Sequence, residues 1–405
     1  MRRVLLILIL LALVIAGIGV YLVATTPKQA EGVRLPLSDA HRQLLARVPA
    51  SADSFALVPT AAALHAELLA NPITRGPVEE WTDKQPHLPA PWMIGRADVV
   101  AWKEEKTTSY AIRLDPLRAF FVRISMMLGG PDQLRWDGST LLMTSGTEAG
   151  MGTEALAPLL RLAEGLPRGD ALVYQLERRT GGGFPPIGRP AASMIAVDPK
   201  EILITSRAES TAPPPAVAAA TPQLATGAIL SAWFAEPPRV LGDLNRLFGT
   251  RVSTLLDTGG ALAIYDIDTG TLLPRPNLVI AAPPAPATTD RLRELAEMVG
   301  ETRETPGATL ISFDRSSLRL YLMDTFAAPR WPANRWALRI DPQRLLPALD
   351  KVANNPALRY GTPRIHRSAR DLRRWMGPLG QAEVIEAASS SEGTAEVLRV
   401  RIASK

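Results

Sequence analysis

The chain contains no cysteine and only four histidines among its 405 residues. Without cysteine there can be no disulfide bond, no thiolate nucleophile and no cysteine-ligated metal. The histidines form neither an i, i+4 pair nor a His-Glu-x-x-His motif, so the sequence indicates no zinc site and no histidine general base. We therefore expect no metal and no cofactor. The histidines are His41, His65, His87 and His366.

Catalytic motifs are also scarce. The chain has no Gly-x-Ser-x-Gly elbow and no Ser-x-x-Lys pair. Asp-Thr-Gly occurs twice, at Asp257 and Asp268, and resembles the active-site motif of aspartic proteases. The expected strand Ala261–Asp266 separates these two aspartates, so they cannot form a dyad within one chain. Asp268 fits a hairpin turn, while a homodimer that pairs two copies of Asp257 remains an alternative hydrolase hypothesis.

The chain has no strong excess of one charge, because its formal net charge is only +5. Arg2 and Arg3 supply two of these charges, so the remainder is too weakly basic to indicate nucleic acid as a partner. An apolar content of 46% is typical of a globular protein, and the length is sufficient for two hydrophobic cores.

One long apolar run, Val4–Ala24, follows Arg2 and Arg3 directly. Its length, about 31 Å as a helix, matches the hydrocarbon core of a bilayer. The run is longer than the core of a signal peptide, and Leu22 stands where cleavage would need a small residue, so we favour a retained anchor over a cleaved signal peptide. The two arginines hold residues 1–3 in the cytoplasm. The sequence thus predicts a single-pass inner-membrane protein whose C-terminal part is periplasmic.

Composition divides the rest of the chain. Residues 25–34 are expected to be a tether, and 35–208 a first periplasmic lobe. The stretch 209–223 contains three consecutive prolines followed by small residues, which is typical of an extended linker. Residues 224–405 would form a second lobe.

A strand followed by proline and a helix recurs in both lobes. Tyr110–Pro116 and Trp336–Pro342 align almost residue for residue, and Phe55–Pro59 and Ile229–Pro237 are looser copies. Proline fits the first helical turn, and a preceding aspartate can cap it. The recurrence predicts an internal duplication.

Alternating apolar stretches with turn residues between them predict hairpins at 134–144, 194–205, 310–323 and 384–402. The predicted fold is therefore α+β: after the transmembrane helix come two related lobes of largely antiparallel sheet, with helices packed on one face of each sheet.

The most basic segment is 359–374. We expect a helix from about Ser368 that places Arg370, Arg373 and Arg374 on one face, with Leu372, Trp375 and Met376 near the other. This face could contact phospholipid headgroups or an acidic partner, or simply be solvated. The candidate residues are Arg364, Arg367, Arg370, Arg373 and Arg374.

The apolar run, the repeated strand–proline–helix units and the phrase Val48-Pro49-Ala50-Ser51-Ala52-Asp53 resemble one bacterial group. Its members are membrane-anchored envelope proteins of unknown function whose ectodomains open with a Leu-Pro-Ala-Asp-like phrase. This chain differs at the first and fourth positions, Val48 and Ser51. The resemblance implies no catalytic residues.

The sequence therefore favours a non-catalytic binding or scaffold protein of the cell envelope. Its expected partners are the lipid bilayer, through residues 4–24, and an envelope protein, while its oligomeric state stays open. Two alternatives remain: an ectodomain that binds lipid or another apolar ligand, and the homodimeric hydrolase based on Asp257.

Overall fold

The computed structural model describes residues 24, 30–83, 95–104, 107–127, 134–143, 150, 152–176, 190–210, 222–235, 259–268, 275–283, 300–312, 314–361 and 363–404. The chain divides into two compact units, residues 1–199 with 204–209, and residues 200–203 with 210–405. Both are α+β and their strand pairs are antiparallel. The predicted transmembrane run lies outside the described residues, apart from Ala24. Among the helices that are described, none combines the length and apolar character needed to span a bilayer.

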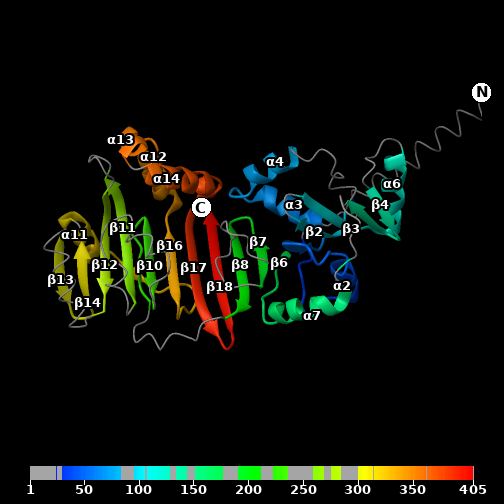
Figure 1. Cartoon of the computed structure of the whole chain (residues 1–405), viewed down its shortest axis with the longest axis horizontal. Coiled ribbons are helices and arrows are strands. Elements are labelled where there is room, and N and C mark those ends of the chain that lie inside the picture. Colours follow the sequence, from blue (N-terminus) through cyan, green and yellow to red (C-terminus); the bar gives the residue numbers. More distant parts are fainter. Residues whose placement is uncertain are drawn as a thin grey trace, which may run out of the picture. The chain divides into compact units, whose positions relative to one another are not determined.

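The first unit is a sheet with helices on both faces (Figure 1). Across the sheet its strands are β8 (Glu201–Glu209, whose first three residues belong to the second unit), β7 (Ala191–Val197), β6 (Ala171–Gln175), β1 (Ser54–Val58), β2 (Asp98–Glu104), β3 (Thr107–Arg113), β5 (Thr140–Met143) and β4 (Leu134–Asp137). Its helices are α2 (Asp39–Leu45), α3 (Ala61–Ala70), α4 (Arg75–Asp83), α6 (Pro116–Met127) and α7 (Gly152–Ala163).

The sequence predicted helices on only one face of each sheet, and this is wrong for the first unit. Phe55 and Leu57 of β1 pack against α2 and α7. Val58, on the opposite face of the same strand, packs with Leu64 of α3. Successive residues of a strand point to opposite faces. Because β1 carries apolar side chains on both faces, helices on both sides of the sheet are needed to bury them.

The second unit has a sheet of the same kind. Its strands run in the order β18 (Ala395–Ser404), β17 (Ala382–Glu392), β16 (Trp336–Ile340), β10 (Leu230–Phe234), β11 (Gly260–Asp268), β12 (Arg275–Ala282), β14 (Ala308–Ser312) and β13 (Glu301–Thr305). A separate two-stranded sheet joins β9 (Leu224–Ala225) to β15 (Phe326–Ala327). The helices are α11 (Arg315–Met323), α12 (Pro342–Ala353), α13 (Pro356–Gly361) and α14 (Pro363–Met376), and a 3-10 turn, η1, covers Gly377–Gln381. Figure 1 shows α12, α13 and α14 grouped together, and α14 contacts both of the others.

The two strand orders correspond position by position. The looser sequence copies, Phe55–Pro59 and Ile229–Pro237, fall on β1 and β10, which occupy corresponding positions. The better-aligned copies, Tyr110–Pro116 and Trp336–Pro342, end β3 and β16, which do not correspond: the counterpart of β3 is β12. A strand that enters a helix through Asp-Pro is a local solution that can arise at unrelated positions.

The predicted hairpins are mostly confirmed. β4 pairs with β5 around Gly138, and β17 pairs with β18. The hairpin at 310–323 is wrong, because Leu318–Met323 belongs to α11. Asp314 caps that helix by accepting a hydrogen bond from the Ser317 amide (2.7 Å), and β14 pairs with β13 instead. Aspartate followed by serine suits a helix cap as well as a turn.

The helix predicted to follow Trp336–Pro342 is confirmed as α12. The Asp341 carboxylate accepts a hydrogen bond from the Arg344 amide (3.1 Å), and Pro342 opens the first turn. The helix buries an apolar stripe: Leu345, Leu346, Leu349 and Val352.

The predicted linker starts inside ordered structure. Glu209 ends β8, and the Ser210 amide donates to the Thr394 carbonyl (2.8 Å). Residues 211–221 lie outside the described part of the chain.

Candidate functional site

The predicted basic surface lies on α14. This helix begins at Pro363 and not near Ser368, because proline is well suited to the first helical turn. Arg367, Arg370 and Arg374 are exposed, whereas Arg373 pairs with Asp350 (2.7 Å). The Arg364 side chain lies outside the described residues.

The apolar side of α14 differs in part from the prediction. Met376 is buried, but Leu372 is 42% exposed. The apolar side chain of Leu372 is therefore exposed to solvent on the same helix as the exposed arginines.

The other residues considered from the sequence are the two Asp-Thr-Gly aspartates and the histidines. Asp257 lies outside the described residues. Asp268 is the last residue of β11 and stands opposite Arg275 of β12, as expected next to a hairpin turn. His41 lies 3.4 Å from Asp98, and His65 lies 3.3 Å from the Thr82 hydroxyl. Within the described ranges, no group of His, Asp and Glu has a geometry suited to a metal ion.

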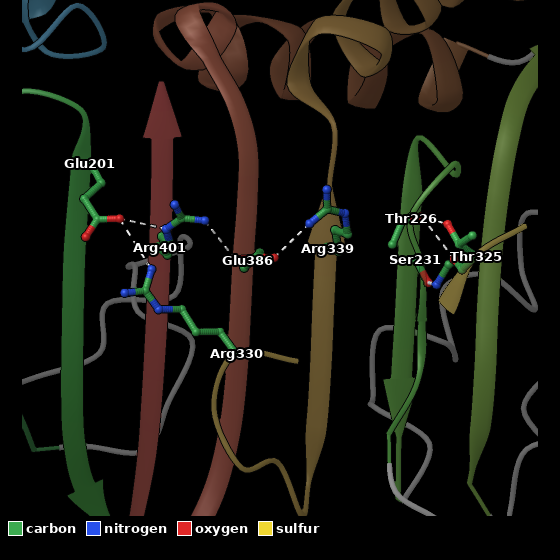
Figure 2. Close-up of polar contacts among 9 residues, drawn as sticks. Glu201, Thr226, Ser231, Thr325, Arg330, Arg339, Glu386 and Arg401 are labelled. Atoms are coloured by element: carbon green, nitrogen blue, oxygen red, sulfur yellow. Dashed lines mark hydrogen bonds and ion pairs between the residues drawn. The ribbon is translucent and has the colours of Figure 1, made fainter. Parts of the chain in front are cut away.

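A row of alternating charges crosses the sheet of the second unit (Figure 2). Glu201 at the start of β8 accepts from Arg401 of β18 (2.8 Å). Arg401 also donates to Glu386 of β17 (3.2 Å), and Glu386 accepts from Arg339 of β16 (2.8 Å). Arg330, from the segment before β16, also pairs with Glu201 (3.4 Å). We call these five residues the charge ladder.

Strand register explains why these side chains meet. Glu386 stands opposite Arg339 and Arg401 in the antiparallel pairings, and Arg339 stands opposite Ser231 of β10. Directly opposed residues share one face of the sheet. The four side chains that lie on strands are 21–29% exposed, so this is a partly buried ion network within reach of a partner.

Electrostatics favour the ionised forms of Glu201 and Arg401. The hydrogen bond from Arg401, together with the nearby Arg330, lowers the pKa of the Glu201 carboxyl. In return, the hydrogen bonds to Glu201 and Glu386 raise the pKa of Arg401. Each partner stabilises the charged form of the other.

The segment Ala327–Trp331 lies next to the ladder. Together with Arg339 and Glu386 it lines a hollow of about 20 Å³. That volume has room for about one water molecule, so this hollow cannot hold a lipid chain.

A polar contact set fixes the start of this segment. The Asp324 carboxylate accepts from the Tyr265 hydroxyl (2.8 Å) and from the Gly227 amide (2.9 Å). Burial, with Asp324 as the acceptor, raises the pKa of Tyr265, so the phenol stays a donor at physiological pH. Thr226 and Thr325 also bond to each other (2.6 Å; Figure 2). The segment therefore leaves α11 along a defined path.

Apolar side chains are exposed on α11 and β15, which come shortly before Arg330 in the chain. Leu320 and Met323, one helical turn apart on α11, are exposed, and Met323 is 72% exposed. Phe326 of β15 is also exposed, and its ring contacts Tyr321 edge-on (5.0 Å between centroids). We call Leu320, Met323, Phe326 and the charge ladder the docking face. Apolar side chains beside charged ones are typical of protein interfaces.

The sequence interpretation missed this face. The available signal was a set of charges within otherwise apolar strands, in Trp336-Ala-Leu-Arg-Ile and Leu398-Arg-Val-Arg-Ile. Charged residues within a sheet are seldom fully buried unless they are paired. Their partners could be assigned only once the strand register was known.

Comparison with known proteins yields no family model, no curated protein and no solved structure that matches this chain.

Proposed function

We propose that this chain is a non-catalytic binding or scaffold protein of the bacterial cell envelope. Residues 4–24 would anchor it in the inner membrane, with residues 1–3 in the cytoplasm and both units in the periplasm. The apolar run after Arg2 and Arg3 supports this placement. The bacterial membrane-anchored group described above remains the proposed family.

The observation that carries the binding role is the docking face. Its apolar part offers area to bury, and its charged part offers orientation and selectivity. Three arginines stand against two glutamates, and Arg330, the most exposed of the five, makes the longest of these contacts. The matching partner is a protein segment in which an apolar side chain lies beside a carboxylate.

We also propose that the two units arose by internal duplication. The matching strand orders support this origin, as does the sequence likeness between β1 and β10. Under this origin, the docking face is a feature that only one copy acquired.

Site-specific photocrosslinking tests the binding role. A photoreactive phenylalanine analogue at Phe326, in the full-length chain in native membranes, should crosslink to a protein partner. Met323→Asp should abolish the crosslink, because a charge on the apolar part cannot be buried cheaply. Arg330→Glu should weaken it by repelling the partner carboxylate.

Leu372→Asp is the matched control, since Leu372 is an exposed apolar residue on α14, outside the docking face. It should leave the crosslink unchanged. Equal loss in all three variants, or crosslinks to lipid only, would contradict the proposed role.

A further inference from the structure

The residues that follow the predicted anchor are built into the first unit. Val33 is completely buried in its core and its amide donates to the Gly169 carbonyl. Leu37 is buried in the same cluster. The predicted tether, 25–34, is thus joined to the first unit from Ala30 onward.

Two side chains hold the start of this segment. The Ala30 amide donates to Glu67 of α3 (3.0 Å), and the Glu31 amide donates to the Thr60 hydroxyl (2.9 Å). Thr60 has a φ of +49°, a left-handed conformation that β-branched residues strongly disfavour. Arg168 donates to the Glu31 carbonyl as well. The attachment is therefore a specific part of the fold.

Chain length then limits how far the first unit can be from the membrane. From Ala24, the end of the apolar run, to Ala30 there are six peptide steps, which span at most about 20 Å. If the run ends at the membrane surface, the attachment point on α3 lies within that distance of the bilayer.

Helix α6 belongs to the same layer as α3. Val58, which packs against α3, stands directly opposite Val99, which packs against α6. Opposed residues share a face of the sheet. Both helices therefore cover the face where the chain enters from the anchor.

The outer side of α6 has the composition of a membrane-surface helix. Leu117, Phe120 and Ile124, spaced three and four apart, are all exposed, and Phe120 is 56% exposed. Their spacing places them on one side of the helix. The helix contains no acidic residue, and its exposed Arg123 lies over the Trp136 ring (4.6 Å). An apolar stripe with flanking arginine favours the interface of an anionic bilayer.

Helix α4 carries the only other exposed large apolar side chain described in the first unit, Trp81. Trp81 stands among Glu79, Glu80 and Asp83, which anionic headgroups would repel. The contact is therefore confined to α6.

We propose that the outer side of α6 lies in the interface of the membrane that the anchor spans. Leu117, Phe120 and Ile124 enter the acyl boundary, and Arg123 faces the headgroups. This inference rests on the proposed anchor.

The absence of cysteine makes the test direct, because any introduced cysteine is unique. Full-length Phe120→Cys and Gln43→Cys, each labelled with the fluorophore NBD, are reconstituted in phosphatidylethanolamine–phosphatidylglycerol vesicles. Gln43 is an exposed residue of α2, on the opposite face of the sheet. Lipids with a nitroxide near the headgroup should quench NBD at position 120 strongly and NBD at position 43 little.

A companion variant separates contact from folding. With NBD at Leu117→Cys, the added change Phe120→Asp should reduce quenching and leave the melting temperature unchanged, because Phe120 is largely exposed. Equal quenching at positions 120 and 43 would overturn the proposal. So would a blue-shifted but unquenched label at position 120, which would indicate a covering protein or a second copy.

Alkaline carbonate extraction distinguishes failure of the anchor from failure of this inference. Protein released by carbonate would overturn both. Protein that is retained, with an unquenched label at position 120, would overturn only the contact of α6.

Discussion

In the first unit, the row of residues that crosses β2, β1 and β6 is Trp102, Phe55 and Tyr174, and all three are buried. In the corresponding row of the second unit, Ser231 of β10 is followed by Arg339, Glu386 and Arg401. The same topology therefore carries an aromatic core at one place and a charge ladder at the other.

The helix after the corresponding hairpins accounts for this difference. In the first unit α7, which follows β5, packs against β7 and α2 and closes this face. In the second unit α11, which follows β14, packs on β11, β12 and β14. The chain then continues through segment 324–335, which contains only the two-residue strand β15, before β16. Side chains on β16 and β17 thus keep contact with solvent, and charged residues are tolerated there.

Truncating the aromatic row should have the largest effect. Phe55→Ala should lower the unfolding free energy of the first unit by about 3–5 kcal/mol, because it leaves a cavity beside the Tyr174 ring, 4.8 Å away between centroids. Hydrogen exchange of the β1 amides measures this change.

Ser231→Ala, at the corresponding place in the second unit, removes only the hydrogen bond from the Ala225 amide (2.9 Å). It should cost about 1 kcal/mol. Equal losses of unfolding free energy from Phe55→Ala and Ser231→Ala would contradict the difference proposed between the two rows.

Breaking the ladder should have an intermediate effect. Glu386→Ala leaves Arg339 and Arg401 without the carboxylate between them, at a cost of about 1–2 kcal/mol for a partly buried network. Thermal unfolding measures it. Arg315→Ala is the control, because Arg315 is 89% exposed in its pair with Glu301, and it should leave the thermal unfolding nearly unchanged.

Giving the second unit the residues of the first sharpens the comparison. In the first unit the positions that correspond to Arg339 and Glu386 are occupied by Tyr174 and Ala192. The double variant Arg339→Tyr/Glu386→Ala introduces these residue types and leaves the pair of Arg401 with Glu201 intact. We expect its stability to lie within about 1 kcal/mol of the parent, since ion pairs can often be replaced without loss. The crosslink from Phe326 should nevertheless disappear. A retained crosslink would show that the ladder takes no part in binding.

The smallest expected effect is on the pH dependence of stability, which should have opposite signs in the two units. The pKa of Glu201 is lowered, chiefly by its hydrogen bond from Arg401. The Glu201 carboxylate therefore stabilises the folded state fully above its ordinary pKa of 4.5. This contribution is lost as the pH falls through the lowered value. In the first unit burial raises the pKa of Glu67 and of Asp170, with nearby Asp198 adding repulsion. These two carboxyls should therefore add stability as the pH falls from neutral through the raised values.

Hydrogen exchange in β18 and in β6, corrected for intrinsic rates, compares the two responses. Glu201→Gln should reduce the change in stability with pH in the second unit. Asp170→Asn should do the same in the first unit. The same sign of change in both units would contradict the pKa assignments.

Much of the local structure could be predicted because its causes are local. Asp341 and Pro342 begin α12, and Gly138 turns a hairpin, within a few residues of the signal that indicates them. The error at Asp314 has the same origin, since one local pattern serves both a turn and a helix cap.

The sequence alone determined that no cysteine chemistry is possible, that the chain opens with a run able to span a bilayer, and that strands pair largely antiparallel. Only the tertiary structure decided that Glu201 meets Arg401, 200 residues away, and that Ala30 is bound by Glu67. The physical reason is that such pairs depend on strand order, register and the reach of a covering helix, which arise from the packing of the whole unit and not from neighbouring residues.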